Sequence, residues 1–248
     1  MRGLLRSELL KQRTTRTNLG FLLIMLALIL FAVALHSFAL KAGSLASHDG
    51  QMHVFGWGGL GALFAALVGA MSITGEIRHG TIRPTFLVTP RRSRVIAVKA
   101  LASCLVGLGF GLAAAGFAIG IGNAALVMRG IPVRLDGADY GQLLVGGTIA
   151  AALWGPIGLG LGAILRNQVA TLVSLFAWLL FVEGLLFGLL SSAGRFLPGI
   201  AGAALSGVTT TGEVKPLLNP VLGALLLVAY LSVATIAGSV LTRHRDVA

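Results

Sequence analysis

Apolar residues in this 248-residue chain gather into six long runs, separated by short segments that hold most of the charged residues. A helix needs roughly 20 apolar residues to cross the hydrocarbon core of a bilayer. Because every run reaches that length, the pattern predicts six transmembrane helices and an all-α integral membrane protein. The six runs are 19–40, 54–75, 96–128, 143–165, 169–191 and 220–241.

The third run is too long for a simple span. Two interpretations stay open: the helix continues beyond the membrane, or it breaks at one of its glycines. These glycines are Gly107, Gly109, Gly111, Gly116, Gly120 and Gly122. Other runs are glycine-rich as well, and small residues spaced by four let helix backbones approach closely. Such GxxxG pairs are Gly107/Gly111, Gly116/Gly120, Gly158/Gly162 and Gly184/Gly188.

Composition supports the membrane assignment. The mean hydropathy is +0.92, and charged residues make up 11% of the chain, against about a quarter in soluble domains. The single cysteine, Cys104, excludes an intrachain disulfide and a Cys-rich metal site. In a membrane protein, the formal net charge of +11 reflects topology rather than nucleic-acid binding.

Positive charges are distributed unevenly between the two sides that six spans define. Of the 19 Lys and Arg residues, 14 fall in the N-terminal tail, the second-to-third loop and its edge, the fourth-to-fifth turn or the C-terminal tail. Cytoplasmic loops carry such an excess. We therefore expect a multi-pass protein of the plasma (inner) membrane, with both termini and the 76–94 loop in the cytoplasm.

Motifs of nucleotide binding and catalysis are missing from the sequence. It lacks GxxxxGK[ST], HExxH, GxSxG and CxxC. His48, Asp49 and His53 lie close together in an expected external loop, and a solvated loop explains them better than a metal site. We predict that the chain is not an enzyme and has no catalytic, metal or cofactor-binding residues.

Two features inside the apolar runs invite a functional interpretation. Glu183 lies in the middle of the fifth run, where a carboxylate is costly and must face other helices or a water-filled cavity. It is a candidate point on a transport path, or else it forms a structural hydrogen bond with a neighbouring helix, for example with Ser or Thr. Pro156, in Trp154-Gly155-Pro156, predicts either a flexible gate or a static kink.

Two segments outside the runs predict helices that do not span. Residues 1–18 suit an interfacial helix rich in arginine. The external segment 195–219 holds an apolar stretch, 196–208, of about 13 residues, which is too short to span and fits a re-entrant or interfacial segment. Pro198 and Gly199 break that stretch near its start.

The loop 76–94 mixes basic residues with apolar ones, which a positive-inside signal does not need. Such a mixture suits docking of a protein partner. The sequence here resembles the permease subunits of ABC-2-type exporters, through an acidic residue, Gly-Thr, a basic residue, an apolar stretch, Thr-Pro and a basic cluster. These are Glu76, Gly80-Thr81, Arg83, Phe86-Leu87-Val88, Thr89-Pro90 and Arg91-Arg92-Ser93-Arg94.

The resemblance implies a single permease domain over residues 1–248, with an N-terminal elbow helix and a coupling helix in the 76–94 loop that docks on an ABC ATPase. Two permease protomers, identical or different, would pair with two ATPase subunits, which would bind ATP and magnesium. Residues implied at the ATPase contact are Glu76, Gly80, Thr81, Ile82, Arg83, Phe86, Leu87 and Pro90, and residues implied at an external gate are Phe196, Leu197 and Pro198.

The function expected on this basis is export of a hydrophobic or amphipathic substrate such as a drug, a peptide or a lipid. The alternative is a self-contained channel or an ion-coupled secondary transporter. A carrier of that kind typically shows paired charges within the membrane and inverted repeats. In this sequence Glu183 is the one deeply placed acid, and no clear repeat is visible.

Overall fold

A computed structural model describes residues 2–39, 41–88, 91–190, 192–208 and 218–244, and these residues form helices and short connections with no strand. Six helical segments within them are long and apolar enough to cross a membrane. They are 16–39, 48–78, 92–128, 137–165, 168–189 and 220–242. The all-α membrane class and all six predicted spans are therefore confirmed, with ends that differ by a few residues.

The helices follow one another along the chain with short connections. In order they are α1 (Arg2–Thr14), α2 (Arg16–Ala39), α3 (Ala42–Leu45), α4 (His48–Phe55), the 3₁₀ turn η1 (Gly56–Gly59), α5 (Leu60–Arg78), α6 (Ile82–Val88), α7 (Arg92–Met128), α8 (Gly137–Leu165), α9 (Gln168–Ala177), the π-helical turn η2 (Trp178–Val182), α10 (Glu183–Leu189), the 3₁₀ turn η3 (Gly194–Phe196), α11 (Pro198–Ser206) and α12 (Pro220–His244).

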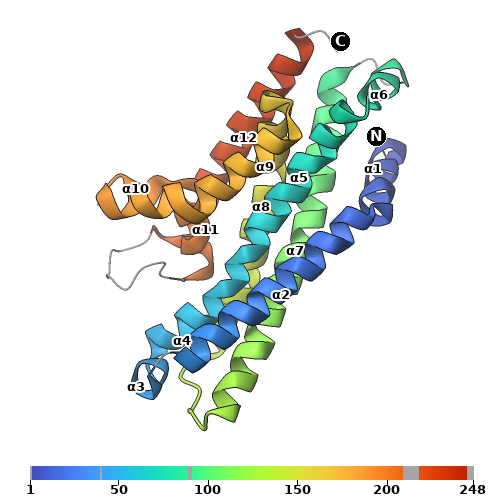
Figure 1. Cartoon of the computed structure of the whole chain (residues 1–248). Coiled ribbons are helices and arrows are strands. Elements are labelled where there is room, and N and C mark those ends of the chain that lie inside the picture. The colour runs from blue at the N-terminus through green and yellow to red at the C-terminus, as the bar shows by residue number, and fades with distance from the viewer. Residues whose placement is uncertain (1, 40, 89–90, 191, 209–217, 245–248) are drawn as a thin grey trace.

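Helices α5 and α8 form the centre of the bundle, and α2, α7, α9 and α12 surround them (Figure 1). In the most apolar windows of the α5 and α8 spans 67% of residues are buried, against 22% in α2 and in α12. Glycine permits the close approach at the centre. A Cβ on Gly69 of α5 would collide with the backbone of Gly155 in α8, and one on Gly158 would collide with the backbone of Ala66.

The predicted GxxxG pairs divide into two groups. Gly107/Gly111 packs α7 onto the α8 backbone, and Gly158/Gly162 packs α8 onto α5. In contrast, a Cβ on any glycine of Gly116/Gly120 or Gly184/Gly188 would have no neighbour within 4 Å among the residues that the structure places. Spacing alone does not distinguish a glycine that packs from one that faces open space.

Helix α7 is unbroken over its 37 residues, so the glycines of the third run do not interrupt it. At 1.5 Å per residue its length is about 55 Å, well beyond a hydrocarbon core of about 30 Å. The helix therefore does not break at its glycines, and its length favours extension beyond the membrane. Figure 1 shows α7 running along the length of the molecule.

Pro156 lies inside α8, and the helix continues through it. Trp154, Gly155 and Pro156 are buried, and the backbone carbonyl of Ser103 in α7 closely covers Gly155. Neighbouring helices hold this segment on several sides, which favours a static packing element over a flexible gate.

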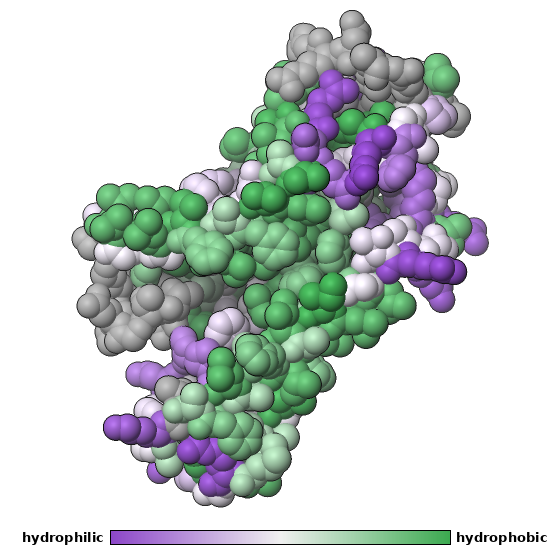
Figure 2. Space-filling model, in the orientation of Figure 1, coloured by the Kyte–Doolittle hydropathy of each residue, from purple (hydrophilic) through white to green (hydrophobic). Residues whose placement is uncertain are grey.

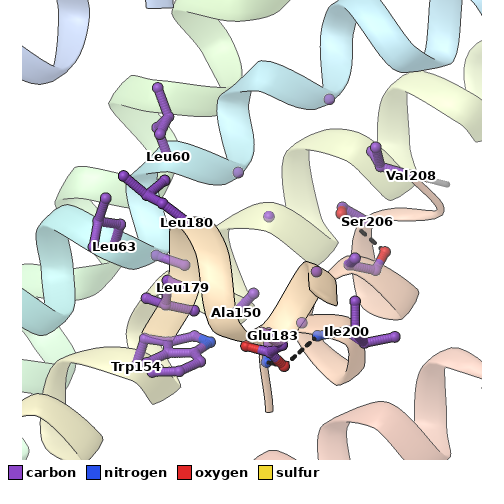
Figure 3. Close-up of a pocket in the computed structure, with 18 of the residues that line it drawn as sticks. Leu60, Leu63, Ala150, Trp154, Leu179, Leu180, Glu183, Ile200, Ser206 and Val208 are labelled. Atoms are coloured by element: carbon purple, nitrogen blue, oxygen red, sulfur yellow. Dashed lines mark hydrogen bonds between the residues drawn. The ribbon is translucent and has the colours of Figure 1, made fainter. Parts of the chain in front are cut away.

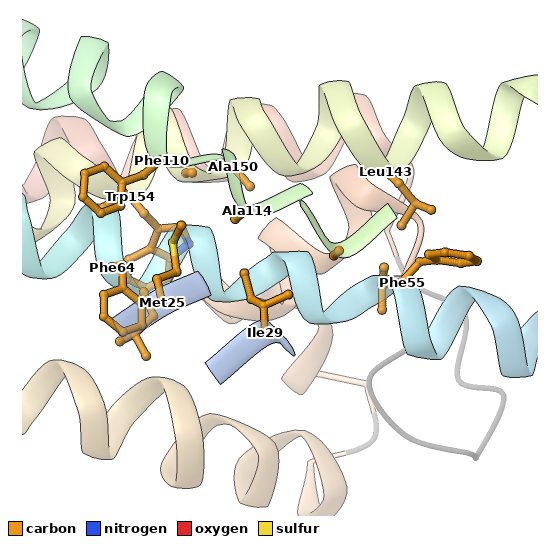
Figure 4. Packing of buried hydrophobic residues seen from close by; sticks show 14 of the residues in the cluster. Met25, Ile29, Phe55, Phe64, Phe110, Ala114, Leu143, Ala150 and Trp154 are labelled. Carbon is orange, nitrogen blue, oxygen red and sulfur yellow. The ribbon is translucent and has the colours of Figure 1, made fainter. Parts of the chain in front are cut away.

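Large side chains from four helices fill the core beside these glycine contacts (Figure 4). Met25 and Ile29 of α2 pack against the same buried cluster as Phe64 of α5, Phe110 of α7 and Trp154 of α8. Phe21 meets Phe64 edge to face, with ring centroids 6.0 Å apart. The small residues therefore set the spacing of the central helices, and the large ones fill the spaces around them.

The two ends of the bundle are formed by different helices. The described ends of α1 and α12 and the short helix α6 lie at one end, whereas α3 and α4 lie at the other (Figure 1). Hydrophilic residues concentrate at both ends of the visible face, and apolar ones cover its middle (Figure 2). The segment with His48, Asp49 and His53, expected to be a loop, is helical, because all three residues belong to α4.

The charge distribution makes a testable prediction about which end is cytoplasmic. In a variant lacking Cys104, a cysteine at exposed Ser44 should react with an impermeant maleimide added to intact cells. A cysteine at Ser93, near the start of α7, should react only after the membrane is permeabilised. Labelling of the Ser93 position from outside intact cells would reverse the proposed orientation.

Candidate functional site

A cavity of about 340 Å³ lies between the first turn of α5, the middle of α8, the segment η2–α10, and α11 (Figure 3). Its walls are mainly apolar, and Leu60, Trp154, Leu179 and Ile200 are among the residues that line it. Glu183 is the single ionisable residue in this lining. Ligand pockets in proteins begin at about this volume and combine apolar walls with a few convergent polar groups.

Glu183 anchors α11 to the fifth span. Its side chain is 2% exposed, and its Oε1 accepts hydrogen bonds from the backbone N–H groups of Gly199 and of Ile200, the latter at 3.0 Å. The first N–H groups of a helix have no partner within the helix. The predicted hydrogen bond to a neighbouring helix is therefore present, but its donors are backbone groups rather than Ser or Thr.

The second carboxylate oxygen of Glu183 has no such partner. Oε2 is buried and accepts no hydrogen bond of ordinary geometry from the residues that the structure describes, although the indole N–H of Trp178 lies near enough to interact with the carboxyl group. Trp57 of η1 also lines the cavity. Its indole Nε1 is buried and donates no hydrogen bond to any residue that the structure describes. Each of these two atoms has almost no accessible surface, so a hydrogen-bond acceptor and a donor lie just beneath the apolar wall of the cavity.

The turn of π-helix η2 directly precedes Glu183 and was not expected from the sequence. Single π-helical turns inside α-helices occur often at functional sites and bend the helix. Figure 1 shows α10 leaving the direction of α9 across η2. This turn and the bend bring Leu179, Leu180 and Glu183 together along one wall of the cavity.

The predicted external segment contains a short helix, as its length suggested. Pro198 is the first residue of α11 rather than a break within it, since proline is favoured at that position. Pro198 is buried, Leu197 is half-buried, and Phe196 is 47% exposed and accepts a hydrogen bond at its carbonyl from Tyr230 Oη at 3.1 Å. Residues 209–217, part of the predicted 195–219 segment, lie outside the described residues.

The 76–94 segment forms the short helix α6 after a turn at Gly80, which adopts a φ of +70°. One expectation here is wrong. Ile82 was predicted to present its side chain to a partner, but it is 3% exposed and packs in a small cluster with Ile73 and Val95. An isoleucine at the start of a short amphipathic helix gains more from covering its own bundle than from facing water.

Leu87 agrees with the docking interpretation, since its side chain is 81% exposed. Thr81 is exposed as well, and its carbonyl accepts a hydrogen bond from Thr85 Oγ1 at 3.1 Å. The side chains of Arg83 and Phe86 and the whole of Pro90 lie outside what the structure describes.

Glu76, expected at the ATPase contact, instead faces the interior. It joins Glu8 of α1, Lys11 of α1 and Lys99 of α7 in an ion cluster that binds the N-terminal helix to the bundle. Lys99 Nζ lies 2.7 Å from Glu8 Oε2 and 2.8 Å from Glu76 Oε1. Lys11 Nζ lies 3.0 Å from Glu8 Oε1 and 3.0 Å from Glu76 Oε1.

The cluster shifts the titration of Glu8. Burial would raise the pKa of its carboxyl, but the charge of Lys99 and hydrogen bonds from Lys99 and Lys11 outweigh burial and hold the pKa below its usual value. A pKa lower in the folded than in the unfolded chain means that this pairing stabilises the fold at neutral pH. That contribution is lost as the pH falls through the lowered pKa.

Histidines near the opposite end have structural partners rather than a common centre. His48 Nε2 lies 3.0 Å from Asp139 Oδ2, and the ring of His53 packs 5.5 Å from that of His36. Within the described residues, His, Cys, Asp and Glu form no group of three or more that could hold a metal ion. His48 Nδ1 lies 3.3 Å from Asp49 Oδ1, whereas His53 packs against His36 instead of joining them.

In comparisons with known proteins, no family model matches the chain and no curated protein matches it.

Proposed function

We propose that this chain is the transmembrane permease subunit of an ATP-driven exporter, powered by a separate ABC ATPase subunit, and that it works beside a second permease protomer. The observation that carries the proposal is the exposed helix α6. It lies at the same end as the described ends of α1 and α12 (Figure 1), and it presents Leu87 to the surroundings.

The sequence supports the same assignment. The basic and apolar motif that resembles ABC-2-type permeases spans α6 and its flanks, and the chain contains no phosphate-binding loop of its own. Energy for transport must then come from elsewhere, and a cytoplasmic ATPase docked at α6 would supply it. The cavity beside Glu183, bordered by α11, would belong to the path of a hydrophobic or amphipathic substrate.

The second candidate is an ion-coupled carrier that needs no ATPase. The observation that favours it is Glu183, a buried carboxylate that lines a cavity among membrane helices. Such groups mark ion and proton paths in pumps and transporters. A carrier of this kind would move its substrate in vesicles with an ion gradient and without ATP.

Site-specific photocrosslinking tests the docking directly. A photoreactive amino acid at Leu87, introduced in the native membrane, should capture an ATP-binding subunit. The same group at Val127, 75% exposed at the far end of α7, should not. Capture of lipid alone at both positions would contradict the proposal.

A further inference from the structure

The cavity beside Glu183 carries an inference about the chemistry of its ligand. Three features define the chemistry: apolar walls, one carboxylate, and no Lys, Arg or His in the lining. An anion would find no countercharge there. A neutral apolar molecule would leave the Glu183 oxygen without a partner, as it is now.

The state of Glu183 points to a cation. Oε1 is occupied by the two N–H groups of α11, so it already has its partners. Oε2 is buried and has no partner at ordinary hydrogen-bond geometry, with the indole N–H of Trp178 nearby. An indole N–H carries no charge, and a carboxylate among membrane helices is costly without a countercharge. A cation bound in the adjoining cavity would offset that cost.

The surrounding side chains suit the rest of such a ligand. Trp57, Trp154 and Phe187 line the cavity and present aromatic rings, which attract cations when water is excluded. Leu60 and Leu179 add aliphatic surface for an apolar body. We propose that this cavity binds a small organic ammonium ion with an apolar body, whose positive charge is balanced by the carboxylate of Glu183.

Glycines in the lining provide a way to fill the cavity without disturbing the fold. A Cβ on Gly184 of α10 would meet no atom within 4 Å among the described residues. Because Gly184 lines the cavity, a leucine at this position has room to occupy part of it. Gly188, one turn later on the same helix, is equally open but is not in the lining. Gly184→Leu and Gly188→Leu therefore form a matched pair.

The test is equilibrium binding to the purified chain in detergent, measured by scintillation proximity with two tritiated probes. The first is 1-naphthylmethylammonium and the second is 1-naphthylmethanol, a neutral molecule of nearly the same shape. The wild-type chain should bind the ammonium probe saturably and about tenfold or more tightly than the alcohol, since hydrogen bonds to charged groups are the strong ones.

The variants separate charge from space. Glu183→Gln keeps an oxygen for the N–H groups of Gly199 and Ile200, so α11 should stay in place. It should weaken ammonium binding about tenfold or more and change alcohol binding by less than about threefold. Gly184→Leu should abolish saturable binding of both probes, and Gly188→Leu should leave both within about threefold of wild type.

Three results would overturn the inference: no saturable binding, equal affinity for the two probes, or ammonium binding that Glu183→Gln leaves unchanged. If Glu183→Gln fails to elute as a single species in size-exclusion chromatography, two measurements still test the inference. They are probe binding by the two glycine variants and the preference of the wild-type chain for the ammonium probe over the alcohol. As a substrate class for an exporter, the inference rests on the proposed function. Binding needs no ATPase. A chain that binds the ammonium probe but has no ATPase partner would therefore refute only the exporter function. A chain that has an ATPase partner but does not bind the ammonium probe would refute only this ligand.

Discussion

Replacing Lys99 with methionine should lower the midpoint of thermal unfolding in detergent by roughly 10 °C or more. Lys99 is 1% exposed and lies within 3 Å of the carboxylates of both Glu8 and Glu76, which are 3% and 13% exposed. Its removal leaves two buried carboxylates with only the half-exposed Lys11 as a countercharge. Breaking a buried ion pair from one side costs about 3–5 kcal/mol.

Matched variants distinguish loss of charge pairing from loss of packing. Lys11→Met removes a side chain that is 51% exposed and should shift the midpoint by only a few degrees. The triple variant Glu8→Gln, Glu76→Gln, Lys99→Met removes the buried charges and leaves the half-exposed Lys11 as the charged member of the cluster, so it should recover most of the loss. A single Lys99→Met variant as stable as wild type would show that the ion cluster does not hold α1 to the bundle.

Substituting Leu87 with aspartate should abolish association with an ATPase subunit and leave the chain itself intact. Leu87 is 81% exposed, so the change should not alter the unfolding midpoint of the isolated chain. An unpaired carboxylate at a protein interface costs several kcal/mol, which weakens a complex about a hundredfold or more. Co-purification from solubilised membranes measures the effect.

The choice of residue matters for this experiment. Ile82→Asp would bury a charge within the chain's own cluster around Ile73, so its failure would say nothing about a partner. Val127→Asp, at the opposite end of the molecule, is the control for adding an exposed acid. If the Leu87→Asp variant still co-purifies with the ATPase, the ATPase docks at another segment, for example at the turn around Arg166.

Hydropathy was enough to predict the spans, because crossing a bilayer imposes a length and a composition on each helix separately. Pairings between helices are not encoded in this local way. Lys99 lies 91 positions from Glu8 and 23 from Glu76, and no periodicity brings the three together. The available signals were a lysine near the start of a long apolar helix and a single acid in a basic N-terminal tail.

Glu183 faces other helices, as predicted, but its hydrogen-bond donors are not the predicted side chains. Glu183 was identified because a carboxylate in the middle of an apolar run is conspicuous, yet its partners are backbone groups of α11, which carry no side-chain signature. Ile82 was wrongly predicted to be exposed, because a helix of seven residues offers too little sequence to decide which of its faces is buried.

We propose that a separate ATPase drives this chain, and ATP hydrolysis across the size-exclusion profile of the tagged chain, purified from its native membranes, tests this most directly. We expect one peak that contains this chain and an ATP-binding subunit in equal amounts and that hydrolyses ATP, whereas the isolated chain should hydrolyse none. A chain that elutes without an ATP-binding subunit, and that carries substrate in vesicles on an ion gradient alone, would contradict it.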